Sequence, residues 1–184
     1  MKHFYSNIQG WFTFPQLYSH VVKNAPQTAH FVEVGTWKGT STAYMGVEIF
    51  NSGKTIKFDC IDPFIAVGDE QPEYKISHED LKKEFIKNMK PLEGHYTLYD
   101  VGSLEVVDKY EEKSLDFVFI DGSHKYEDVV ADIKAWLPKI KKGGFLAGHD
   151  YVNTWPEVVR AVNDTLKKSN VADPWGCSCW MVQI

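Results

Sequence analysis

The chain has 184 residues, a length that suits one domain with a single sizeable core. Hydrophobic residues make up 43% of it and aromatic residues 14%, which is typical of a globular protein and excludes a largely disordered chain. The formal net charge of −5 argues against a protein that binds nucleic acid by neutralising its phosphates.

The predicted elements alternate between helices and strands. Apolar residues at helical spacing predict helices, and short apolar runs that end in glycine or an acidic residue predict buried strands. The predicted helices are 14–24, 40–53, 78–90, 126–140 and 156–169. The predicted strands are 29–35, 55–62, 95–101, 115–121, 143–151 and 179–184, with a long polar loop at 63–77.

This alternation predicts an α/β fold class. We expect a Rossmann-like, mostly parallel sheet with helices on both faces, in which the final strand is antiparallel. The sequence contains no internal repeat, linker or low-complexity tract. We therefore expect one domain over 1–184, with a helical and aromatic N-terminal segment at 1–28 and the core at 29–184.

Targeting signals and cysteines bear on the compartment. No apolar run approaches the roughly 20 residues that a membrane-spanning helix needs. Residues 1–14 lack the apolar stretch of a signal peptide. The three cysteines, Cys60, Cys177 and Cys179, are odd in number and do not read as a disulfide framework. The sequence therefore predicts a reduced, cytoplasmic protein with no membrane partner.

Charged and polar residues follow the predicted strands at the points where these end. Right-handed crossovers bring the carboxyl ends of parallel strands to one edge, where ligands bind in such folds. The alternative is that these residues only mark where strands stop, as in any α/β protein. They are Glu33 to Gly39, Asp62, Ser103, Asp121 and the pair His149–Asp150.

The turn "EVGTWKGTS" at 33–41 looks like a nucleotide-binding turn that lacks one glycine. A dinucleotide fingerprint has a glycine where this chain has Trp37, because the backbone there approaches a pyrophosphate. S-adenosylmethionine carries adenine and ribose but no phosphate, which would explain the missing glycine. Asp62 is placed to accept hydrogen bonds from the ribose hydroxyls. Ser41 can meet the methionine carboxylate together with free backbone N–H groups at the helix start.

The stretches at 31–42 and 116–151 resemble class I S-adenosylmethionine-dependent methyltransferases of a small bacterial and phage branch, and the resemblance covers about 29–165. It implies S-adenosylmethionine as the cofactor. The residues that it implies for the cofactor are Glu33, Gly35, Thr36, Trp37, Gly39 and Ser41 for the methionine moiety, Asp62 for the ribose, Ser103 for the adenine, and Asp121. Relatives often have an acidic residue immediately before the serine, where this chain has Gly102.

The same branch is similar to metal-dependent, catechol-type O-methyltransferases. That resemblance implies a divalent metal held by Asp121, His149 and Asp150, and a general base at His124, where those relatives have lysine. Such a cation lowers the pKa of a bound hydroxyl, and a neutral base removes its proton. His149 in the ligand set would favour Mn²⁺, Fe²⁺ or Zn²⁺ over Mg²⁺. The alternatives are that both histidines only hydrogen-bond locally, or that His149 is a base without a metal.

The sequence thus predicts an enzyme, an S-adenosylmethionine-dependent methyltransferase that acts on a small molecule, on oxygen by this resemblance. Two rival hypotheses remain: an NAD-dependent oxidoreductase, against which Trp37 argues, and a non-catalytic S-adenosylmethionine-binding module. The titratable residues at one edge argue against the second, because a binder does not need them. The aromatic start of the chain would cover the acceptor or pack against a second copy, so a homo-oligomer is one expected arrangement.

Overall fold

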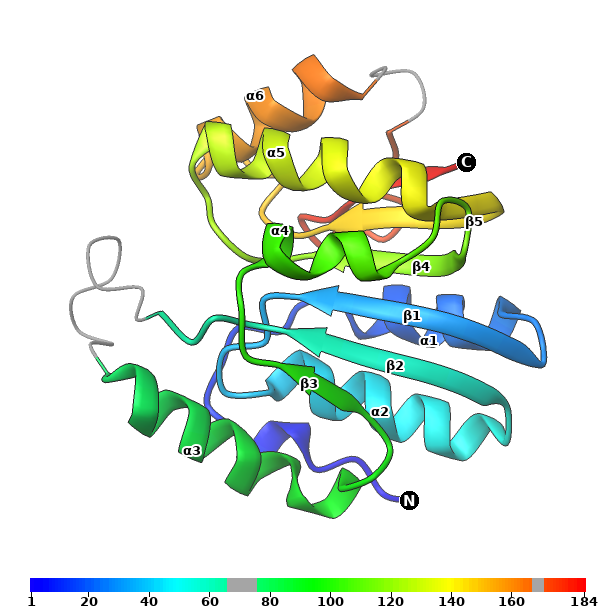
Figure 1. Ribbon diagram of the computed structural model, residues 1–184, viewed down its shortest axis with the longest axis vertical. Coiled ribbons are helices and arrows are strands. Elements are labelled where there is room, and N and C mark those ends of the chain that lie inside the picture. The colour runs from blue at the N-terminus through cyan, green and yellow to red at the C-terminus, as the bar shows by residue number, and fades with distance from the viewer. Residues whose placement is uncertain (66–75, 167–170) are drawn as a thin grey trace.

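The computed structural model describes residues 1–65, 76–166 and 171–184. The α-helices, labelled in Figure 1, are α1 (Pro15–Asn24), α2 (Thr40–Ser52), α3 (His78–Met89), α4 (Ser103–Val106), α5 (Tyr126–Trp136) and α6 (Pro156–Thr165). The strands are β1 (Thr28–Val34), β2 (Thr55–Ile61), β3 (Thr97–Tyr99), β4 (Leu115–Ile120), β5 (Ile140–Gly148) and β6 (Trp180–Gln183). Short 3₁₀ helices lie at Tyr5–Asn7, Lys90–Leu92, Val107–Lys109 and Leu137–Lys139. None of the described helices is long and apolar enough to cross a membrane.

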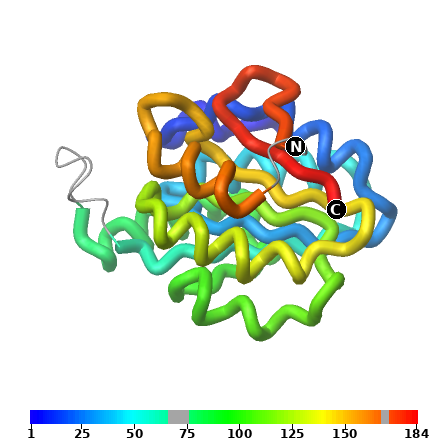
Figure 2. The backbone as a smooth tube through the Cα atoms, turned by 90° about the horizontal axis from the view of Figure 1, so that it is seen from above, coloured from blue at the N-terminus to red at the C-terminus, as the bar shows by residue number. Residues whose placement is uncertain are grey.

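The strands form one sheet in the order β3-β2-β1-β4-β5-β6. The first five are parallel to one another, and β6 pairs with β5 in the antiparallel direction. Figure 2 shows β6, in red, running beside β5. The chain moves outward from β1 in two directions, which creates a switch point between β1 and β4 where such folds bind ligands. The predicted α/β class and the predicted antiparallel last strand are therefore confirmed.

Helices cover both faces of the sheet, and each face has its own apolar core. The helices α1, α2 and α3 bury residues such as Leu17, Met45 and Phe85 against one face. On the other face α4, α5 and α6 bury residues such as Ile133 and Val162. Sheet residues alternate between the two cores because successive side chains of a strand point to opposite faces.

Lys54 shows how the loops hold the helices. Its ammonium donates to three carbonyl oxygens at the end of α1, those of Val22, Lys23 and Ala25, at 2.7–2.8 Å. The last carbonyl groups of a helix lack hydrogen-bond donors within the helix and carry partial negative charge. A lysine ammonium at this position donates to them and offsets that charge. This contact ties the β2 side of the sheet to the helix that leads into β1.

Several predicted element bounds differ from the observed ones: the predicted helix 126–140 ends as an α-helix at Trp136, and β5 ends at Gly148 rather than at the predicted 151. Strand β5 begins at Ile140, earlier than the predicted 143, because Ile140 already pairs with Leu115 of β4, ahead of a register shift that separates this pair from the one between Phe117 and Phe145. Strand β3 has only three residues, Thr97–Tyr99, at the edge of the sheet. The short helix α4 was not predicted. Parts of the predicted loop 63–77 and of the predicted helix 156–169 lie outside the described residues.

Candidate active site

The turn after β1 is built around glycines in the left-handed backbone region. Gly35 has φ +85, and a Cβ placed on it would lie 2.0 Å from the carbonyl oxygen of Asp121. Any side chain at this position would therefore push the β1 and β4 ends apart. Gly39 has φ +91 and is the N-cap residue of α2, so no side chain there covers the first N–H groups of the helix.

Asp62 fastens this turn to the end of β2. One carboxylate oxygen accepts the backbone N–H groups of Thr36 and Trp37, both at 2.7 Å, and the other accepts that of Phe64 at 2.6 Å. Burial raises the pKa of Asp62, and these N–H groups oppose the rise by stabilising the charged form. The predicted ribose ligand is thus also the residue that shapes the loop.

Trp37 has a positive φ of 44, a conformation that costs a residue with a side chain about 1–2 kcal/mol. The hydrogen bond from its N–H group to Asp62 holds it there. The indole ring lies 4.8 Å from the ring of Trp11, at 32°, and the ammonium group of Lys38 lies 4.8 Å from its centre. The indole therefore packs against the N-terminal segment, and Trp11 remains 49% exposed.

Glu33 lies behind the turn, where it is 1% exposed. Its carboxylate accepts the hydroxyls of Tyr18 at 2.7 Å and Thr42 at 2.6 Å. Burial raises the pKa of Glu33 to about 7, although hydrogen bonds from Thr42, Ser41 and Tyr18 oppose this. The structure thus places both Glu33 and Ser41 in a buried network that joins α1, β1 and α2, which positions the turn.

Ser103 begins α4 and joins it to α5. Its hydroxyl donates to Asp132 and accepts the indole N–H of Trp136 at 2.8 Å. Burial raises the pKa of Asp132 to about 6, and the Ser103 hydrogen bond opposes the rise. Because the hydroxyl is engaged in both directions, the Ser103 side chain supports the loop after β3.

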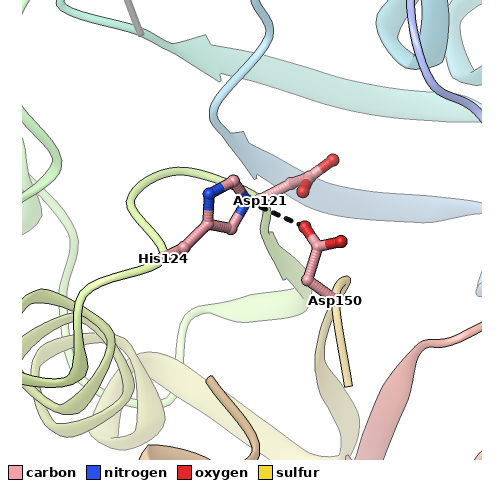
Figure 3. Close-up of side chains that lie close together, drawn as sticks. All are labelled: Asp121, His124 and Asp150. Atoms are coloured by element: carbon pink, nitrogen blue, oxygen red, sulfur yellow. Dashed lines mark hydrogen bonds and ion pairs between the residues drawn. The ribbon is translucent and has the colours of Figure 1, made fainter. Parts of the chain in front are cut away.

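The ends of β4 and β5 bring three predicted site residues together (Figure 3). Asp121, His124 and Asp150 each offer one ligand atom, and these atoms all lie within 4.8 Å of one another. Nε2 of His124 lies 2.9 Å from a carboxylate oxygen of Asp150. Asp150 has φ +59, a rare conformation for a residue with a side chain, and such strain is concentrated at functional sites.

His149 completes this cluster from the other side. Its Nδ1 lies 3.3 Å from Asp150 and 3.7 Å from Asp121, and its Nε2 lies 3.0 Å from the hydroxyl of Thr13. The structure therefore brings together all four residues that the sequence assigned to the metal or the base. In the described part of the chain, the contacts to the Asp121 and Asp150 carboxylates come from these two imidazoles.

The charges within the cluster are strongly coupled. Burial raises the pKa of Asp121 to about 6, although His149 and His124 oppose this. Burial would also raise the pKa of Asp150, but hydrogen bonds to His124 and His149 hold it well below its ordinary value. For His149, burial acts to lower the pKa, and the neighbouring Asp150 and Asp121 carboxylates raise it overall. Such paired shifts at the edge of a sheet are typical of a functional site.

Comparisons with known proteins agree with this geometry. The model of a family described as a methyltransferase domain matches residues 32–151, from the start of the turn to just beyond the His149–Asp150 pair. The chain belongs to this family of class I S-adenosylmethionine-dependent methyltransferases. The alignment covers both the glycine turn and the titratable cluster.

Three further relationships concern sequence and fold. An uncharacterized protein of Acanthamoeba polyphaga mimivirus is 29% identical over 160 residues, which are 80% of this chain and 66% of that protein. The O-methyltransferase NovP is 19% identical with a TM-score of 0.70, over 93% of this chain and 79% of that one. A TDP-rhamnose 3′-O-methyltransferase of calicheamicin biosynthesis is 15% identical with a TM-score of 0.62, over 92% and 76% of the two chains. At these identities the solved structures show the fold.

The chemical groups of the turn at 33–41 suit S-adenosylmethionine. The uncapped start of α2 offers N–H groups to a carboxylate, and the glycine turn leaves backbone rather than side chains at the switch point. The cluster fits a divalent cation. Its ligands combine carboxylate oxygen and imidazole nitrogen, a set that suits Mn²⁺, Fe²⁺ or Zn²⁺.

Two residues of the methyltransferase site were missed by sequence reasoning. Trp155 stacks on His124, with ring centres 3.9 Å apart at 21°, and Thr13 contacts His149. Thr13 and His149 are 136 positions apart, so no spacing rule connects them. For Trp155 a signal existed, since an aromatic residue before the proline that begins α6 stands near the end of β5.

Proposed function

We propose that this methyltransferase transfers the methyl group of S-adenosylmethionine to a hydroxyl oxygen of a small molecule, with the help of a divalent cation. One observation carries the proposal: the Asp121 and Asp150 carboxylates converge with the imidazoles of His124 and His149 directly beside the glycine turn, where Gly35 packs against the Asp121 carbonyl. A group that activates a hydroxyl thus lies at the same edge as the cofactor turn.

The β1–β2 half of the edge holds the cofactor. The N–H groups at the start of α2 bind its carboxylate, and Asp62 accepts from its ribose hydroxyls while keeping the turn in shape. Glu33 and Ser103 act from behind, through the buried networks that fix the turn and the loop after β3. Most of the predicted cofactor residues therefore contribute by shaping the site.

The β4–β5 half activates the acceptor. Asp121, His149 and Asp150 would hold the cation, whose positive charge would lower the pKa of the acceptor hydroxyl. His124 would accept the hydroxyl proton at Nδ1, because Asp150 orients the ring by accepting the hydrogen of the other nitrogen, Nε2, and Trp155 packs on the ring face. With cofactor and acceptor bound, the acceptor oxygen would bond to the methyl carbon while the sulfur–methyl bond breaks and its electron pair stays on sulfur, which would leave S-adenosylhomocysteine as the product. Alignment of oxygen, carbon and sulfur supplies much of the rate.

The acceptor is a small molecule with a ring. Trp11 presents a half-exposed indole next to Trp37, and flat apolar surfaces of this kind bind the faces of aromatic and sugar rings. The two structural neighbours named above are O-methyltransferases, and one of them acts on a sugar nucleotide. Both points support oxygen as the atom that receives the methyl group.

A screen of phenols, catechols and sugars with S-adenosylmethionine tests the proposal, with release of S-adenosylhomocysteine as the signal. Activity should fall on chelation and return with Mn²⁺. In His124→Ala the rate should fall by roughly 10²- to 10⁴-fold while Mn²⁺ affinity is retained. A chelator-insensitive enzyme would remove the cation from the proposal. A His124→Ala variant that loses Mn²⁺ affinity would make His124 a ligand rather than the base.

A further inference from the structure

A chain of hydrogen bonds links the N-terminal segment, His149 and the C-terminal segment. The hydroxyl oxygen of Thr13 lies 3.1 Å from the carbonyl oxygen of Cys177 and 3.0 Å from Nε2 of His149. A carbonyl oxygen can only accept, so the single hydrogen of the hydroxyl points to Cys177. The hydroxyl oxygen then accepts from His149. In the arrangement that satisfies both contacts, Nε2 of His149 carries a proton.

The opposite nitrogen of the same ring faces the carboxylates. Nδ1 lies 3.3 Å from Asp150 and 3.7 Å from Asp121. With the Nε2 proton fixed, the position between Nδ1 and the two carboxylates is filled by a second proton or by a cation. Ligands about 2.1 Å from a cation lie roughly 3.0–3.5 Å from one another, which is close to these separations.

The ring has little freedom to turn. Phe14, the residue after Thr13, is fully buried and packs against the imidazole with ring centres 4.8 Å apart at 47°. The His149 side chain is 10% exposed. Thr13 thus holds the His149 ring at Nε2, and the next residue, Phe14, packs against the ring itself. The relative orientation of Nδ1 and the carboxylates is fixed in advance.

We infer that Thr13 is a positioning residue that selects the His149 tautomer with Nδ1 free for a cation, with the Cys177 carbonyl as the anchor of Thr13. The inference rests on the proposed function in that the cation is the one assigned there. The tautomer of a histidine ligand is set by the hydrogen bond that its other ring nitrogen makes. Because Thr13 makes that hydrogen bond, the first 14 residues belong to the site and do not merely cover it.

Thr13→Val is the decisive variant, since valine keeps the shape and removes the hydroxyl. Thr13 is exposed, so the variant is expected to fold. Its affinity for Mn²⁺ alone, measured by electron paramagnetic resonance without cofactor or acceptor, should fall by roughly 10- to 100-fold. Thr13→Ser should keep wild-type affinity. Thr55→Val, on an exposed threonine that starts β2 at the other edge of the sheet, is the matched control and should change nothing.

Equal Mn²⁺ affinity in wild type and Thr13→Val would overturn the inference while leaving the proposed function intact. If the wild type binds no divalent cation, the metal part of the proposed function fails. The inference is then judged only by which ring nitrogen of His149 carries the proton. Nitrogen-15 NMR of His149 in the metal-free wild type should show a protonated Nε2. An unprotonated Nε2 would overturn the inference whatever the metal result.

Discussion

Asp62 and Asp121 directly follow β2 and β4, the two strands that flank β1 and its turn on opposite sides, yet their surroundings differ. The Asp62 carboxylate accepts hydrogen bonds from three backbone N–H groups of its own chain, so the fold itself supplies it with donors. Among the described residues, the Asp121 carboxylate is contacted by an imidazole and by no backbone N–H group. One half of the edge uses a carboxylate to build a loop, and the other half keeps carboxylates for a ligand. Acidic residues in equivalent sequence positions therefore have different roles.

Gly35→Ala should produce the largest loss of stability, because it disrupts the contact between the turn after β1 and the end of β4. The new Cβ would lie 2.0 Å from the Asp121 carbonyl oxygen, and alanine at φ +85 is strained as well. We expect unfolding free energy to fall by about 3 kcal/mol or more in chemical denaturation. Gly53→Ala is the matched control: it has φ +66 and nothing within 4 Å of the added atom. It should cost about 1–2 kcal/mol. Equal losses in both would mean that the close approach at Gly35 does not matter.

Glu33→Gln should change the pH dependence of stability. The folded pKa of Glu33 is raised to about 7 from an ordinary 4.5, so the folded state favours the protonated form. The stability that this gives is fully present below pH 4.5 and is lost as the pH rises through 7. Relative to Glu33→Gln, the wild type should therefore lose up to ~3 kcal/mol between those values. Parallel curves for the two proteins in pH-resolved denaturation would show that the buried carboxyl does not titrate as described.

Asparagine at the two contrasted aspartates should move stability in opposite directions at pH 8. Asp62→Asn places an amide NH₂ among backbone N–H donors and leaves at least one of them unsatisfied, a cost of about 1–3 kcal/mol. Asp121→Asn removes a carboxylate whose pKa burial raises to about 6, and should leave stability equal or higher. Thermal unfolding checks both. A destabilised Asp121→Asn would show that this carboxylate serves the fold.

Ser103→Ala should have the smallest effect. It removes the hydroxyl that serves both Asp132 and the Trp136 indole N–H, which costs about 1–2 kcal/mol for buried polar groups left without it. Cofactor affinity should weaken only slightly if Ser103 acts by supporting α4. A large loss of affinity at unchanged stability would instead restore the direct adenine contact that the sequence resemblance implies.

The mostly parallel sheet, the helices on both of its faces and the edge at which the strand-ending residues gather could be predicted from sequence, because apolar periodicity and strand-ending residues are local patterns. The antiparallel β6 was predicted as well. The four-residue helix α4 could not be predicted, since so short a helix has no apolar repeat. The division of labour between Asp62 and Asp121 was also beyond the sequence: both end apolar strands, and their difference depends on which N–H groups the folded loop turns toward them.

The partners of the cluster were equally hidden. Thr13 lies on a segment that was expected to cover the acceptor or to pack against a second copy, and its contact with His149 exists because the start of α1 packs beside the end of β5. His149 itself was assigned from the resemblance to metal-dependent O-methyltransferases. The sequence does not show where each ring nitrogen of a histidine points. That orientation decides whether the histidine can act as a metal ligand or as a base.

Titration calorimetry with S-adenosylhomocysteine tests the division of the edge most directly. Asp62→Asn should lose affinity by on the order of 100-fold, because both the turn and the ribose contact depend on it. Asp121→Asn should stay within about threefold of the wild type, since its carboxylate is assigned to the cation, and should lose the response of the wild type to added Mn²⁺. Wild-type affinity in Asp62→Asn, or abolished binding in Asp121→Asn, would contradict the account.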